Sequence, residues 1–264
     1  MADSRKGQTT AAQRWAAALA GWAIPDHILA QAPESPWGFP PALFGVQDAT
    51  DSALHRLARA RLAQRGRVLD VGCGGGAASI PLAANASILI GVDSSLEMLA
   101  AFARAATGAE VAHQEVRGDW PGVAGEAPIA DVVVCRNVVY NVADIAPFVT
   151  ALSAHATRRV VVELTDRHPS VAFGPLWREF WDLDRPDGPG ADLFADLLGE
   201  LGIHPVIESE ARPVHKAGHA DADYVAFVRR RLCLPGSRDS QIAAALSALP
   251  RPSITAVAIA WDLS

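Results

Sequence analysis

Several residue types are scarce in this chain, and each scarcity excludes a class of protein. Only three of the 264 residues are cysteines, and because they form no C-x-x-C pair we expect neither a disulfide framework nor a metal site. No apolar run reaches the ~18–20 residues that would cross a bilayer, so no membrane association is expected. Cysteines without partners are typical of the reducing cytoplasm, where we expect the protein to work.

Positive charge is also in deficit. The 23 lysines and arginines are outnumbered by 29 aspartates and glutamates, which gives a net charge of −6. Domains that bind nucleic acid usually carry a basic surplus, so nucleic acid is not an expected partner. Half of the residues are hydrophobic, which is ordinary for a globular protein and excludes a disordered chain.

Short apolar runs alternate with helical stretches from residue 67 onward. The runs expected to form strands are 67–72, 86–93, 110–116, 131–136, 159–166, 204–211 and 254–263. The stretches expected to form helices are 50–64, 77–84, 96–106, 143–156, 175–181, 191–201 and 222–234. Strands that alternate with helices predict a parallel sheet with right-handed crossovers. No linker-like composition divides the chain, so a single domain is expected.

The most informative stretch is 68–76, VLDVGCGGG, in which an apolar strand runs into a glycine-rich turn. Glycines allow a tight bend and let a ligand approach the backbone closely. A phosphate loop of the kinase type would need Lys-Ser or Lys-Thr after the last glycine, where this chain has Ala77-Ala78. A dinucleotide site stays open, because the turn fits G-x-G-x-x-A and Asp93 follows Gly72 by 21 residues.

The same turn also carries an acidic residue at its start. The spacing Asp70-x-Gly72-x-Gly74-x-Gly76 resembles motif I of the class I S-adenosylmethionine-dependent methyltransferases. Three later stretches resemble that family's further motifs in the expected order: 91–99 (GVDSSLEML), 118–120 (GDW), and 130–136 (ADVVVCR) with the loop 137–142. The resemblance covers residues 65–166.

This resemblance implies a doubly wound α/β fold with a mostly parallel seven-stranded sheet in the order 3-2-1-4-5-7-6. Helices would cover both faces, an N-terminal helical cap would precede the sheet, and the last strand, 254–263, would be antiparallel. We expect one methyltransferase domain over 1–264. Its parts would be an N-terminal cap segment (1–64), a cofactor-binding half (65–170) and an acceptor-side half (171–264).

The resemblance further implies that the cofactor is S-adenosyl-L-methionine. The turn 72–74 would run beneath its methionine part, Asp70 would face its ammonium, and Asp93 would accept both ribose hydroxyls. Asp119 would receive the adenine amino group, with Trp120 packed on the ring. The residues expected to bind the cofactor are Asp70, Gly72, Gly74, Asp93, Ser94, Met98, Asp119, Trp120 and Arg136. Independently, three carboxylates at strand ends suit an ammonium, a diol and an amine, and they would repel a pyrophosphate.

The expected reaction is in-line methyl transfer to a small-molecule acceptor. A general base is needed only if the acceptor is protonated at the working pH, so no catalytic residue is assigned. Two residues are candidates. Tyr140 has the N-x-x-Y spacing of the N-P-P-Y motif of amino-directed methyltransferases, although both prolines are missing. The alternative is that Tyr140 is a packed aromatic residue. His168 is a base beyond the fifth strand, or a turn residue before Pro169.

Two other functions remain open from the sequence. An NAD(P)-dependent oxidoreductase would need a Tyr/Lys or similar pair for hydride transfer, and the two lysines, Lys6 and Lys216, lie far from the predicted strand ends. A non-catalytic protein that binds S-adenosylmethionine would carry the same motifs. The aromatic stretch Trp37-Gly38-Phe39 is a hypothetical lid over the cofactor.

Overall fold

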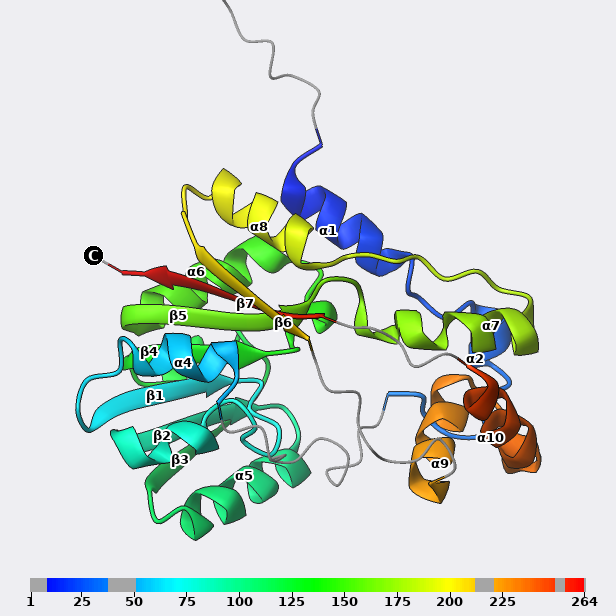
Figure 1. Cartoon of the computed structure of the whole chain (residues 1–264), viewed down its shortest axis with the longest axis horizontal. Coiled ribbons are helices and arrows are strands. Elements are labelled where there is room, and N and C mark those ends of the chain that lie inside the picture. The colour runs from blue at the N-terminus through cyan, green and yellow to red at the C-terminus, as the bar shows by residue number, and fades with distance from the viewer. Residues whose placement is uncertain (1–8, 38–50, 212–220, 250–254, 264) are drawn as a thin grey trace, which may run out of the picture.

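A computed structural model describes residues 9–37, 51–211, 221–249 and 255–263 of the chain. Within these residues, seven strands form one sheet in the order β3-β2-β1-β4-β5-β7-β6 (Figure 1). The pairs formed among β1 to β5 are parallel, and β7 is antiparallel to both β5 and β6. The predicted strand order and the reversal of the last strand are confirmed.

The strands lie close to the predicted ranges, and so do most of the helices between residues 53 and 231. The strands are β1 (Gly66–Val71), β2 (Ala86–Asp93), β3 (Ala112–Arg117), β4 (Ala130–Arg136), β5 (Ala156–Thr165), β6 (Val206–Ala211) and β7 (Thr255–Asp262). The helices are α1 (Ala11–Ala20), α2 (Asp26–Leu29), α4 (Ala53–Arg59), α5 (Leu96–Gly108), α6 (Ile145–His155), α7 (Gly174–Trp181), α8 (Ala191–Glu200), α9 (Ala222–Arg231) and α10 (Asp239–Ala248). No helix in the described residues is long and apolar enough to cross a membrane.

The prediction of an α-helix over 77–84 is wrong. A short 3-10 helix, η1 (Ile80–Asn85), follows the glycine-rich turn instead, with Pro81 in its first positions. Pro81 has no N–H to donate to the Ala77 carbonyl four residues before it, and side chains of His55 and Arg136 contact that carbonyl instead, so a regular α-helix does not form here. The turn therefore does not run directly into an α-helix that could hold a phosphate at its N-terminus.

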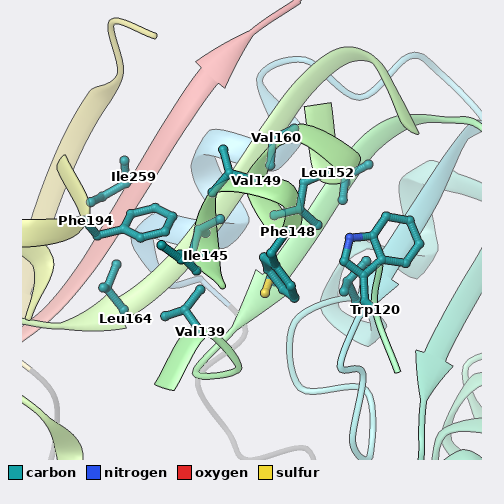
Figure 2. Close-up of a cluster of buried hydrophobic side chains, with 14 of the residues drawn as sticks. Trp120, Val139, Ile145, Phe148, Val149, Leu152, Val160, Leu164, Phe194 and Ile259 are labelled. Atoms are coloured by element: carbon teal, nitrogen blue, oxygen red, sulfur yellow. The ribbon is translucent and has the colours of Figure 1, made fainter. Parts of the chain in front are cut away.

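The apolar runs are buried because helices cover both faces of the sheet. Side chains of α1, α6 and α8 pack on one face, and Figure 2 shows Phe148 of α6 and Phe194 of α8 in that layer. Side chains of α4 and α5, including Phe102, pack on the other face. Strand β3 lies at the edge of the sheet, and only Val116 in it is buried.

A third hydrophobic cluster lies outside these two layers. It joins α2, α7, α9 and α10, which we call the outer helices, through residues such as Ile28, Trp177, Phe227 and Ile242. Figure 1 shows α7, α9 and α10 beyond the sheet, at the end where β5 and β6 finish. The N-terminal segment is divided, because α1 and α4 cover opposite faces of the sheet and only α2 joins the outer helices. Of the hypothetical lid, Gly38 and Phe39 lie outside the described residues.

Candidate functional site

The glycine-rich turn follows β1 at the carboxyl edge of the sheet. Gly72 and Gly74 have φ angles of 69° and 50°, which L side chains adopt at a cost. A Cβ atom at Gly72 would lie 2.3 Å from a methyl carbon of Val138, so the loop after β4 packs directly on the turn. A Cβ atom at Gly74 would meet nothing within 4 Å, so the turn is open on that side.

These two glycines make a matched pair of substitutions. Gly74→Ala should lower the free energy of unfolding by roughly 1–2 kcal/mol, because only the left-handed backbone is strained. Gly72→Ala should cost about 1–3 kcal/mol more, because the new methyl group also overlaps Val138. Urea unfolding of both variants measures the difference, and equal losses would contradict the packing of Val138 on this turn.

Asp70 is the acidic residue at the end of β1, and it is completely buried. Its Oδ2 accepts a hydrogen bond from the Ser79 hydroxyl at 2.6 Å, whereas its Oδ1 has no partner among the described residues. Burial raises the pKa of this carboxyl group to about 7, against the opposing effect of Ser79. A buried oxygen without a partner is costly, so it marks a place where a ligand could donate hydrogen bonds.

Asp93 ends β2 and joins the turn to the start of α5. Its Oδ2 accepts the N–H of Gly74 at 3.0 Å, and its Oδ1 accepts the N–H of Ser95 at 2.9 Å. Ser95 in turn caps α5 by accepting the N–H of Met98. Because a carboxylate has about four lone-pair sites, both oxygens of Asp93 can accept a further hydrogen bond. Of the other residues expected here, Ser94 is exposed and Met98 is buried.

The loop after β3 lies beside Asp93, because the N–H of Gly118 donates to the Asp93 carbonyl at 3.1 Å. The side chain of Asp119 is exposed on this loop. Trp120 does not share that exposure: its ring packs edge-on against His155, 4.8 Å between centroids, within the core that Figure 2 shows. These contacts favour a core residue over a ring that stacks on the adenine.

Arg136 ends β4 and forms a buried ion pair with Glu163 of β5. Its Nε donates to Glu163 Oε1 at 2.7 Å, and the Glu163 side chain is almost completely buried. One terminal nitrogen of Arg136 also donates to the Ala77 carbonyl, just after the glycine-rich turn, at 3.4 Å. The Arg136 charge acts on Asp70 as well, where it lowers the pKa of the carboxyl group against the effect of burial.

Tyr140 holds the loop after β4 against β5. Its hydroxyl accepts the N–H of Thr165 at 2.8 Å and lies 2.8 Å from the Thr165 hydroxyl. Its ring stacks near Trp15 of α1, with 6.2 Å between centroids. These contacts favour the packed aromatic over a residue that touches an acceptor.

His168 lies in the loop after β5 and begins the 3-10 helix η4 (Pro169–Phe173). Its Nδ1 accepts the N–H of Ser170 at 3.2 Å, so the neutral ring carries its hydrogen on Nε2 and its one lone pair already accepts a hydrogen bond. Burial lowers the pKa of His168 to about 3. The contacts favour a turn residue over a general base.

Two residues near the site were not identified from the sequence. His55 of α4 is completely buried and lies 3.2 Å from the Ala77 carbonyl through its Nε2. Arg185 lies over the rings of Trp22 and Trp177, 5.0 and 4.9 Å from their centroids, and Trp22 stacks on His168 at 4.0 Å. Arg185 thus connects α7 to the end of β5. No local sequence motif indicated the contacts of His55 or of Arg185.

Comparisons with known proteins agree with this architecture. The family model for the methyltransferase domain matches residues 46–205. A ubiquinone biosynthesis O-methyltransferase from Rhizobium rhizogenes is 38% identical over 86 residues, which are 32% of this chain and 34% of that protein. The match thus spans about a third of the length of this curated relative.

Two solved structures share the fold. An S-adenosylmethionine-dependent methyltransferase from Thiobacillus denitrificans, in complex with S-adenosyl-L-homocysteine, is 18% identical with a TM-score of 0.55 and covers 90% of this chain and 98% of its own. The YcgJ protein from Bacillus subtilis is 16% identical with a TM-score of 0.55 and covers 79% and 97%. Because the family model spans more than half of the residues, the chain belongs to the methyltransferase domain family, the class I S-adenosylmethionine-dependent enzymes that its motifs resemble.

Proposed function

We propose that this chain transfers the methyl group of S-adenosylmethionine to a small-molecule acceptor. The observation that carries the proposal is the series of acidic residues at the ends of the adjacent strands β1, β2 and β3. Asp70 and Asp93 lie at the ends of β1 and β2, and Asp119 follows β3 by two residues. The carboxyl ends of parallel strands meet at one edge of a sheet, which is where open α/β sheets bind their ligands.

The residues at this edge fit the cofactor. Oδ1 of Asp70, which has no partner in the part of the chain that the structure describes, suits an ammonium group, and the remaining lone pairs of Asp93 suit a pair of ribose hydroxyls. The exposed carboxylate of Asp119 suits the adenine amino group, and the open side of Gly74 leaves room for close approach. Ser94 and Met98 follow Asp93 in the chain and, with Gly72, remain part of the proposed cofactor site.

The chain's own contribution to the reaction is positioning. When bound, the cofactor supplies a methyl group on a sulfonium, which is an excellent leaving group. The protein must hold the acceptor in line and exclude water, and such positioning alone can contribute roughly 7–11 kcal/mol. We assign the acceptor side to residues 171–264, because their outer helices α7, α9 and α10 lie beyond the carboxyl edge (Figure 1).

The cellular compartment follows as part of the proposal. All three cysteines of the chain, Cys73, Cys135 and Cys233, are buried free thiols. Burial raises the pKa of the thiols of Cys73 and Cys135 above the ordinary value, so both thiols are neutral and unreactive. Three buried thiols are in keeping with a reducing compartment, and we infer that the protein works in the cytoplasm.

Calorimetric titration tests the cofactor. S-adenosylmethionine and S-adenosylhomocysteine should bind to the protein, and NADH should give no heat of binding, because the acidic edge repels its pyrophosphate. Tight binding of NADH with none of S-adenosylhomocysteine would overturn the proposal in favour of an oxidoreductase. Release of S-adenosylhomocysteine during incubation with pools of hydroxyl- and amine-bearing small molecules separates an enzyme from a protein that only binds the cofactor.

A further inference from the structure

The methionine end of the proposed cofactor carries a carboxylate as well as an ammonium. Asp70 is proposed to bind the ammonium, but the three aspartates of this edge carry the same charge as the carboxylate and cannot pair with it. A carboxylate taken into a partly buried site needs a cation or several hydrogen-bond donors, because leaving its charge unpaired is costly. The group that supplies them should lie next to Asp70, since the two charges share one carbon atom in the ligand.

The sheet register brings Arg136 to this position. Asp70 of β1 pairs with Val134 of the neighbouring strand β4, and Arg136 stands two residues further on. Because side chains of a strand alternate between faces, Asp70, Val134 and Arg136 point to the same side of the sheet. Val68 and Val134 are both buried in the layer beneath α4 and α5, which identifies that side.

The hydrogen bonds of Arg136 hold its guanidinium against the glycine-rich turn and leave donors unused. A guanidinium has five N–H donors, and two of them go to Glu163 and the Ala77 carbonyl. The contacts among the described residues thus leave three donors for a ligand. The Arg136 side chain is 19% exposed whereas that of Glu163 is 2% exposed, so the open side of the pair is the arginine.

Glu163 has a separate effect on this site. Its carboxylate compensates the charge of Arg136, so the guanidinium can stay in place before a ligand arrives. His55 is the other nitrogen base near the Ala77 carbonyl, but burial lowers its pKa to about 4, so it is neutral at physiological pH. Of the two described side chains that contact the Ala77 carbonyl, Arg136 is therefore the cation.

We propose that Arg136 binds the α-carboxylate of the cofactor, so that Asp70 and Arg136 together recognise the two charges of its amino acid end. A negative and a positive side chain side by side complement a zwitterion, whereas Asp70 alone would accept any amine. This inference rests on the proposed function, because it assumes that S-adenosylmethionine occupies the edge.

The test compares two ligands on two proteins by calorimetry. S-adenosylhomocysteine carries both charges, and its decarboxylated analogue keeps the ammonium but lacks the carboxylate. Wild-type protein should bind the analogue about 10–100 times more weakly, the loss expected for a hydrogen bond between charged groups. Arg136→Met should bind both ligands within about threefold of each other, because its preference for the carboxylate is gone.

Further variants keep the test decisive if Arg136→Met folds poorly with Glu163 left unpaired. The double variant R136M/E163Q removes both charges and should also lose the preference. Arg136→Lys keeps a positive charge at this position and should retain most of the preference for S-adenosylhomocysteine over its decarboxylated analogue. Arg158→Met is the matched control, because Arg158 is an exposed arginine paired with Asp131 at the opposite end of β5, and it should keep the wild-type preference.

The outcomes separate the two proposals. Undiminished preference for S-adenosylhomocysteine in Arg136→Met and in R136M/E163Q would overturn the role of Arg136 and leave the proposed function standing. Failure of wild-type protein to bind S-adenosylhomocysteine would overturn the proposed function, and this inference with it.

Discussion

Replacing Asp93 with alanine should weaken the binding of S-adenosylhomocysteine by about 2–4 kcal/mol, or roughly 30- to 1000-fold. The loss has two sources. The variant lacks the carboxylate proposed to accept both ribose hydroxyls. It also lacks the acceptor for the N–H groups of Gly74 and Ser95, which hold the turn and the start of α5 together.

Calorimetry on Asp93→Ala and on two companion variants separates these sources. Asp93→Asn keeps one carbonyl oxygen as an acceptor and should show an intermediate loss. Asp196→Ala removes an exposed carboxylate of α8, paired with Arg14, and should leave the affinity unchanged. An Asp93→Ala affinity within twofold of the wild type would remove Asp93 from the cofactor site.

The ligand-free protein should lose stability as the pH rises from about 4 to about 7, by up to about 4 kcal/mol through Asp70 alone. Burial raises the pKa of this carboxyl group to about 7 in the folded state, whereas the ordinary value is 3.8. The folded state therefore holds the proton more tightly than the unfolded state. The stabilising contribution is complete below pH 3.8 and is lost as the pH approaches 7.

Urea unfolding at several pH values measures this effect against Asp70→Asn, which cannot titrate. As the pH rises through this range, the free energy of unfolding of the wild type should fall relative to that of the variant. The variant should nevertheless bind S-adenosylhomocysteine poorly. Asp119→Asn is the control, since its side chain is exposed, and it should follow the wild-type profile. Parallel pH profiles for wild type and Asp70→Asn would show that Asp70 does not titrate in this range.

These two aspartates illustrate a division of roles at the edge. Asp93 is already bonded to backbone N–H groups, so its carboxylate also supports the fold of the turn. Asp70 has a buried oxygen without a partner among the described residues, which destabilises the ligand-free protein. We expect an ammonium ligand to remove that cost, so that ligand binding and stability are coupled at Asp70.

Much of the fold could be predicted because its signals are local. The apolar runs of β1, β2, β4 and β5 are typical of strands buried on both faces of a parallel sheet, whereas the mostly polar β3 lies at the edge. The spacing of acidic and glycine residues after β1 to β3 likewise reflects the need for particular groups at particular strand ends. The misassigned element 77–84 has helix-forming residues, but Pro81 within it lacks the N–H that a regular α-helix would need.

By itself, the sequence determined the order of elements, the family and the edge at which the acidic residues gather. Only the tertiary structure decided which side chains meet there: that Arg136 pairs with Glu163, that Trp120 packs on His155, and that the Nδ1 lone pair of His168 accepts the N–H of Ser170. The physical reason is that burial of one face of a helix or strand requires apolar residues at regular intervals along a single segment, which can be read from the sequence. The pairing of distant side chains depends on how strands and loops pack across the sheet, and the sequence of a single segment contains no signal for such a pairing.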